Sequence, residues 1–282
     1  RTCGQLLEAI LLNDLKLKAK GFLQMNITIG DIDVAYTEKG AGEPVVLVHG
    51  LAEDSKSFEN IQAKLSGFKT YAYDIRGHGK TTLGDANGSL EQLGQDLIGF
   101  LDHVSGPAKC VGYSLGGTIV LSAVLQRPEL VKRATIVATS AVVGRAAAEF
   151  FDQRINLIKA DKAAFDKALT EDTKAQICGS DLDILEIVTR RIKAVGSGGG
   201  YINAARAMIG VREKPLTPRL SEIKCPVDII GADKDSFCPR KAADIMLEGL
   251  THGTYREIED CGHLISIDQP VAYSDQLSDC LG

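Results

Sequence analysis

Residues 109–121 read KCVGYSLGGTIVL, and this stretch decides how the rest of the chain can fold. Its first half is a short apolar run typical of a buried strand, and its second half has the apolar pattern of a helix. The junction, GYSLG at 112–116, follows the pattern G-x-S-x-G. A serine on a tight strand-to-helix turn needs small neighbours, and a helix start favours developing negative charge. We therefore interpret Ser114 as a nucleophile; the alternative is a glycine-rich turn whose serine has no chemical role.

A nucleophilic serine needs a base, and the base needs an acid that orients it. His263 directly follows the last predicted strand, and Asp233 and Asp235 follow the strand before it. Because loops at the carboxyl ends of parallel strands share one edge of a sheet, these side chains can reach Ser114. His252 precedes the last strand and is expected at the opposite edge. The chain order serine, aspartate, histidine is that of a nucleophile-elbow enzyme, and the residues alone leave both aspartates open.

Of the other three histidines, two are expected to be structural. His49 and His78 follow predicted strands, but each sits beside glycine in a tight turn, where we expect hydrogen bonds that hold the backbone. His103 lies in a predicted helix and is expected at the surface.

Strand and helix patterns alternate along most of the chain, which predicts βαβ units and a parallel sheet. Between 143 and 219 the pattern is helical only. We therefore predict an α/β core over 23–142 and 220–282, a helical lid inserted over 143–219, and an N-terminal helical extension over 1–22. Strands are expected at 23–29, 31–36, 45–50, 69–74, 109–114, 134–139, 227–232 and 254–260, and helices at 5–20, 57–66, 89–104, 143–159, 161–176, 181–195, 200–211 and after Pro270.

Composition excludes several classes of protein. The net charge of −5 and the pI near 5.6 give no positive field to attract nucleic acid. The longest apolar runs are far shorter than the roughly 20 residues of a membrane span. The seven cysteines are scattered without a C-x-x-C pair, which indicates reduced thiols rather than a zinc site or a disulfide framework. With no secretory signal pattern, we expect a cytoplasmic protein that binds neither nucleic acid nor membrane.

Taken together, the motifs resemble the α/β-hydrolase superfamily over residues 23–282. The resemblance rests on VLVHG at 46–50, DIRGHGKT at 74–81, GYSLGG at 112–117, GADKD with its following proline at 231–239, and GH at 262–263. It implies a mostly parallel sheet flanked by helices, with a helical lid. In the family the acid commonly lies four residues before a proline, which favours Asp235, four residues before Pro239, over Asp233. The chain is similar to small bacterial carboxylesterases and 3-oxoadipate enol-lactonases.

The resemblance also implies a mechanism. Ser114 would attack an acyl carbon, His263 would take and return its proton, and Asp235 would fix the imidazole tautomer. The oxyanion hole would consist of the backbone N–H groups of Leu51 and Leu115. No metal or organic cofactor is implied.

The lid is expected to supply much of the substrate pocket. Our candidates for substrate binding are Phe150, Arg154 and Tyr201. A lid arginine could bind a substrate carboxylate, and the sequence does not choose among Arg145, Arg154, Arg190 and Arg191.

The favoured function is hydrolysis of a small carboxylic ester or lactone. Two alternatives stay open: a carbon–carbon or amide hydrolase with the same three residues, and a ligand-binding receptor on the same fold, since a fold alone does not establish a function. The expected partner is a small-molecule substrate, and the N-terminal helix leaves a homodimer open.

Overall fold

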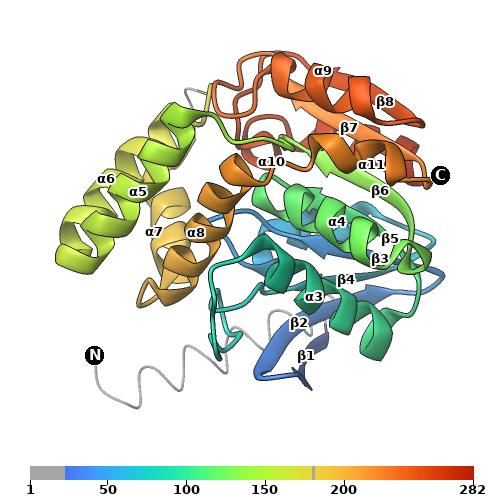
Figure 1. The fold of residues 1–282 in the computed structure, drawn as a ribbon, viewed down its shortest axis with the longest axis horizontal. Coiled ribbons are helices and arrows are strands. Elements are labelled where there is room, and N and C mark those ends of the chain that lie inside the picture. Colours follow the sequence, from blue (N-terminus) through green and yellow to red (C-terminus); the bar gives the residue numbers. More distant parts are fainter. Residues whose placement is uncertain (1–22, 180–181) are drawn as a thin grey trace.

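The computed structural model describes residues 23–179 and 182–282 (Figure 1). The predicted N-terminal extension, residues 1–22 with its helix at 5–20, lies outside the described residues. Within the described parts of the chain, no helix combines the length and apolarity that crossing a bilayer requires.

The centre of the fold is an eight-stranded sheet in the order β1-β2-β4-β3-β5-β6-β7-β8. β1 and β2 form the predicted hairpin, β2 is also antiparallel to β4, and all later pairings are parallel. The sheet is therefore mostly parallel, as predicted. Its strands are β1 Leu23–Ile29, β2 Ile32–Gly40, β3 Glu43–Val48, β4 Phe68–Tyr73, β5 Ala108–Tyr113, β6 Val131–Val137, β7 Val227–Ala232 and β8 Gly253–Ile258.

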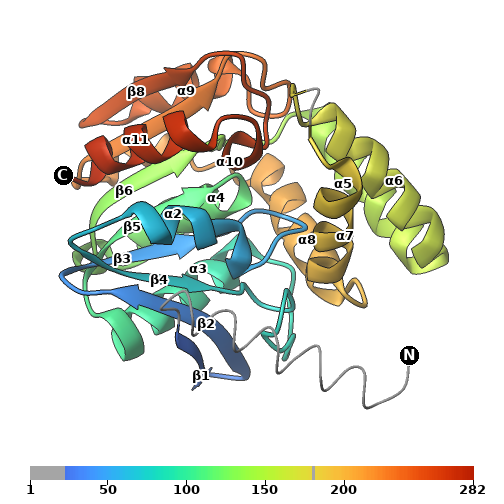
Figure 2. The same ribbon diagram turned by 180° about the vertical axis from the view of Figure 1, so that it is seen from behind.

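Helices cover both faces of this sheet (Figures 1 and 2). Successive residues of a strand point to opposite faces. Val46 and Val48 of β3 belong to one buried cluster, and Val45 and Leu47 to the other. The first cluster includes side chains of α3 (Leu90–Phe100), α4 (Leu115–Gln126) and α9 (Arg240–Gly249). The second includes side chains of α2 (Glu59–Lys64) and α11 (Pro270–Leu281). Burial on both faces explains why the central strands are continuous apolar runs.

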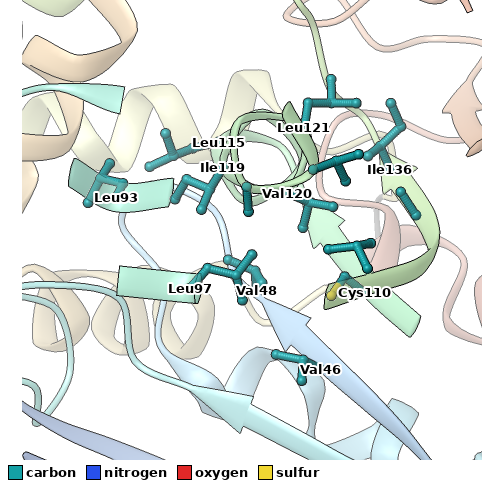
Figure 3. Close-up of a cluster of buried hydrophobic side chains, with 14 of the residues drawn as sticks. Val46, Val48, Leu93, Leu97, Cys110, Leu115, Ile119, Val120, Leu121 and Ile136 are labelled. Atoms are coloured by element: carbon teal, nitrogen blue, oxygen red, sulfur yellow. The ribbon is translucent and has the colours of Figure 1, made fainter. Parts of the chain in front are cut away.

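The helix α4, which follows the GYSLG turn, packs at the centre of the first cluster (Figure 3). Ile119 and Val120 point from α4 toward the sheet and toward Leu93 and Leu97 of α3. All four side chains are almost inaccessible to solvent. This packing fixes the start of α4, and with it Ser114, relative to the strands.

Four helices fill the stretch between β6 and β7 and lie together beyond one end of the sheet (Figures 1 and 2). They are α5 Arg145–Ala160, α6 Lys162–Ala175, α7 Ile184–Val195 and α8 Gly199–Glu213. They share a small core in which Phe165 packs edge-on against Tyr201, with ring centroids 4.8 Å apart. The predicted helix 181–195 starts later than expected because the Asp183 side chain caps it by accepting a hydrogen bond from the N–H of Glu186.

Two other predicted helices differ in detail. The helix expected at 57–66 is a 3₁₀ turn at Ser55–Phe58 followed by the short α2. The helix expected at 89–104 ends its α-helical part at Phe100 and continues as a π-helical turn over Leu101–Ser105. Periodicity identifies such segments but does not resolve 3₁₀ and π turns at their ends.

Residues 74–81 form hydrogen bonds that connect two loops of the core. Asp74 accepts hydrogen bonds from the backbone N–H groups of Ser55 and Lys80, at 2.7 and 2.8 Å. Thr81 donates to the Asp74 carbonyl and accepts from the N–H of Ala35. These contacts connect the loop after β3 to the loop after β4, so the motif has a structural role.

Arg76 is the buried charge in this segment. Its guanidinium donates two hydrogen bonds to Asp31, both at 2.8 Å, and two to Asp96, at 2.8 and 2.7 Å. Arg76 is 3% exposed and Asp96 7% exposed. Two carboxylates therefore satisfy one planar cation: Asp96 is buried with it, and Asp31 lies at the surface.

We expect Arg76→Ala to lower the free energy of unfolding by about 3–5 kcal/mol, because it leaves the buried Asp96 without its partner. Urea unfolding measures the change. Arg127→Ala is the control, since Arg127 forms exposed ion pairs and should cost less than about 1 kcal/mol. Equal losses from the two variants would contradict a structural role for Arg76.

Candidate active site

Ser114 lies on a strained turn between β5 and α4. Its φ is +51° and its ψ is −119°, a conformation that L residues rarely adopt. The turn is held because the N–H of Ser114 donates to the Val137 carbonyl at 2.8 Å, and the Thr139 hydroxyl donates to the Ser114 carbonyl at 3.0 Å. The strain lifts the serine side chain out of the regular helix.

Close backbone approach explains the glycines around this serine. A Cβ atom at Gly116 would lie 2.0 Å from the Val48 carbonyl oxygen of β3. A Cβ atom at Gly112 would lie 2.4 Å from the carbonyl oxygen of Gly116. Both positions therefore exclude any side chain, and the G-x-S-x-G pattern is a steric requirement of this turn.

Ser114, His263 and Asp235 form one hydrogen-bonded line. The Ser114 Oγ lies 3.1 Å from His263 Nε2, and His263 Nδ1 lies 2.8 Å from Asp235 Oδ2. Burial alone would raise the pKa of Asp235, but the hydrogen bond and charge of His263 and the N–H groups of Cys238 and Phe237 lower it below its usual value. An ionised Asp235 accepts a hydrogen bond from the Nδ1–H group of His263, which leaves Nε2 free to accept the Ser114 hydroxyl proton.

Asp233 lies outside the hydrogen-bonded line of Ser114, His263 and Asp235. It is exposed, and it accepts a hydrogen bond from the N–H of Cys261 at 2.9 Å. It therefore supports the loop that carries His263 without contacting the imidazole. The structure brings Asp235, and not Asp233, to the histidine.

The His263 loop is held from two sides. The Tyr113 hydroxyl donates to the His263 carbonyl at 2.9 Å, and the N–H of Leu264 donates to the Gln176 carbonyl at 3.0 Å. The Asp268 carboxylate accepts from the N–H groups of Gly262 and Cys178. The segment after α6 is thus bound directly to this loop. Sequence reasoning missed Asp268 because its partners are backbone N–H groups, and missed Gln176 because it holds this loop through its own backbone carbonyl; neither leaves a sequence pattern.

The other histidines lie outside this line. His49 Nδ1 bonds to the Gly50 carbonyl, and its Nε2 accepts from the N–H of Ile75 at 3.0 Å. Burial lowers the pKa of His49 to about 4 and that of His78 to about 3, so both are neutral at pH 7. His103 is exposed on the π-helical turn. The expectation of a structural role for His49 and His78 and of a surface position for His103 is consistent with their contacts.

The backbone N–H groups of Leu51 and Leu115 belong to residues that line the same cavity as Ser114. Leu115 is the first residue of α4, and Leu51 precedes Ala52, whose φ is +59°. Within 23–179 and 182–282, neither N–H has a hydrogen-bond partner in the protein. Such free donors at a helix start can stabilise an oxyanion.

A cavity of about 560 Å³ opens onto Ser114 and His263. Its walls are mainly apolar and come from the core and from the helices α5–α8. Of the predicted lid residues, Phe150 and Tyr201 line it. Arg154 does not; its guanidinium packs over the Phe150 ring and forms two hydrogen bonds to Asp172, at 2.7 and 2.6 Å.

The side chains at this site are poorly suited to bind a metal ion. In the described part of the chain, the group of side chains whose ligating atoms cluster is Asp235, Cys238 and His263. Asp235 and His263 already satisfy each other. Burial raises the pKa of the Cys238 thiol well above its usual value, so the thiolate that a metal prefers is disfavoured.

Comparisons with known proteins identify the family of this chain. The family model described as alpha/beta hydrolase fold matches residues 43–270. The chain is 29% identical to 3-oxoadipate enol-lactonase 2 of Acinetobacter baylyi, over 72% of this chain and 74% of that protein. It is 26% identical to (E)-2-((N-methylformamido)methylene)succinate hydrolase of the same organism, over 83% and 89%.

Solved structures share the fold. The enol-lactonase from Burkholderia xenovorans LB400 matches with a TM-score of 0.81 at 21% identity, over 91% of this chain and 99% of that one. The esterase EaEST from Exiguobacterium antarcticum matches with a TM-score of 0.81 at 22% identity, over 92% and 100%.

We expect Asp235→Asn to slow the reaction of Ser114 with a fluorophosphonate probe by about 10⁴-fold, because an amide no longer holds the required imidazole tautomer. The labelling rate, followed by mass spectrometry, measures the effect. Asp233→Asn is the matched control and should label at nearly the original rate. A larger effect at Asp233 than at Asp235 would contradict the arrangement.

Proposed function

Because the chain belongs to the α/β hydrolase fold family, we propose that it is a serine hydrolase that cleaves a small carboxylic ester or lactone. The observation that carries the proposal is the line Ser114–His263–Asp235, which ends in a largely apolar cavity beside two free backbone donors. No metal or cofactor is needed for this chemistry.

The reaction starts with attack of the Ser114 oxygen on the acyl carbon. His263 Nε2 accepts the serine proton, and Asp235 stabilises the imidazolium that forms. Negative charge develops on the carbonyl oxygen, where the N–H groups of Leu51 and Leu115 receive it. Because these donors are fixed by the fold, they need no reorganisation in the transition state.

The tetrahedral intermediate collapses when His263 donates its proton to the leaving oxygen. The C–O bond breaks and the acyl group stays on Ser114. A water molecule then gives its proton to His263 and attacks the acyl carbon, and the same donors stabilise the second oxyanion. Return of the proton to Ser114 releases the carboxylic acid.

Helices α5–α8 act in this proposal as the lid. Phe150 and Tyr201 would contact the substrate, and the apolar wall would exclude water from the acyl carbon. The names of the similar proteins, an enol-lactonase, a succinate-derivative hydrolase and an esterase, support a substrate of modest size.

Ser114→Ala should lower ester hydrolysis by about 10⁶-fold, to the background rate, because the nucleophile is lost while the fold is kept. Release of 4-nitrophenol from short acyl esters, together with titration of acid released from lactones, measures the activity. Ser122→Ala, a change on the same helix outside the cavity, should keep the activity. Undiminished turnover by Ser114→Ala would overturn the proposal, and absence of turnover by the folded original protein would favour a receptor.

A further inference from the structure

Arg191 of α7 is a buried cation on the wall of the cavity that contains Ser114. Its side chain is 8% exposed. One terminal nitrogen donates to the Gln176 side-chain carbonyl, while the Nε has no partner. Among the ion pairs of the described residues, such as Arg76–Asp96 and Arg154–Asp172, none includes Arg191, although the buried Glu53 carboxyl is close enough to be influenced by its charge. The guanidinium therefore meets one neutral amide oxygen, a nearby carboxyl that does not pair with it, and the cavity.

The three other arginines that the sequence offered as carboxylate-binding candidates differ from Arg191. Arg154 is neutralised by Asp172, with two hydrogen bonds. Arg145 is exposed and pairs with Glu149 at the surface. Arg190, the neighbour of Arg191 on α7, is exposed and does not line this cavity. The structure thus separates four arginines that the sequence could not distinguish.

Glu53 is a buried acid whose pKa is influenced by the charge of Arg191. Burial raises the pKa of Glu53, the charge of Arg191 acts against that rise, and one carboxylate oxygen of Glu53 has no hydrogen-bond partner. The same charge opposes the burial-driven rise in the pKa of the Tyr113 phenol. Arg191 therefore lies near Glu53 and Tyr113, and one oxygen of the Glu53 carboxyl has no hydrogen-bond partner among the described residues.

A buried guanidinium without a carboxylate is costly, and its planar fork matches a carboxylate with two parallel hydrogen bonds. We propose that Arg191, with Gln176, binds a carboxylate of the substrate, so that the substrate is an anionic ester or lactone with a second, charged end. The proposal rests on the proposed function, which places the reacting carbonyl at Ser114. Arg191 would then select the substrate and orient its acyl carbon.

The cavity walls fit such a molecule. The apolar side chains of Phe150, Phe151, Val143 and Met208 line the cavity together with Ser114 and Arg191 and would contact a hydrocarbon chain. Asp172 also lines it, but its charge is used by Arg154. Lys241 is the other cation on the wall; it is exposed, so water already solvates it. We therefore assign the recognition of the substrate carboxylate to Arg191.

The test uses two 4-nitrophenyl esters of adipic acid, one with the distal carboxylate free and one with it methylated. The original protein should hydrolyse the free acid with a kcat/KM about 10- to 100-fold higher, the range for a hydrogen bond to a charged group. Arg191→Gln should remove that preference mainly by raising the KM for the free acid, and should reduce hydrolysis of the methyl ester much less. Arg190→Gln removes the same charge one residue away and should keep the preference for the free acid.

The outcomes separate the two proposals. Equal rates on both esters with the original protein, or equal losses on both esters in Arg191→Gln, would overturn the carboxylate site and leave the hydrolase intact. Loss of the preference in Lys241→Gln but not in Arg191→Gln would also overturn it. Absence of turnover on either ester, with no fluorophosphonate label on Ser114, would overturn the proposed function and this inference together.

Discussion

The close contact between the GYSLG turn and β3 is the constraint on which the rest of the site depends. Gly116 lies against the Val48 carbonyl with no room for a side chain, and this proximity brings the start of α4 beside the loop that begins at His49. The backbone strain at Ser114 is sustained because α4 is packed into the largest buried cluster. The close contact between Gly116 and the Val48 carbonyl thus brings together the serine, the free N–H of Leu115 and the free N–H of Leu51.

The second constraint joins the segment between β6 and β7 to the core. The loop of His263 is bonded to Tyr113 in the core and to Gln176 after α6, while Asp268 bridges that loop and Cys178. The position of the imidazole therefore depends on this helical segment as well as on the sheet. Gln176 has two roles here, since its carbonyl holds the loop and its side chain holds Arg191. Substrate selection at Arg191 and the position of His263 consequently share one residue.

Much of the fold could be predicted from the sequence because its signals are local. Buried parallel strands appear as apolar runs, and the turn at Ser114 allows only glycine at two positions, which makes a motif. The choice between Asp233 and Asp235 could not be made from the residues alone, because both follow the same strand and differ only in the direction that the loop gives them. Arg191 could not be separated from Arg154 because the difference lies in a partner, Asp172, on another helix. Asp268 left no signal because it binds backbone N–H groups.

The central claim, an acyl group carried by Ser114, is tested most directly by partitioning with an added alcohol. Three esters that share one acyl group and differ in leaving group would be hydrolysed in aqueous methanol, and the ratio of methyl ester to free acid measured for each. A common acyl-enzyme requires the same ratio for all three, because the leaving group has departed before water or methanol attacks. A ratio that changes with the leaving group would mean that water attacks the bound ester directly and would contradict the account.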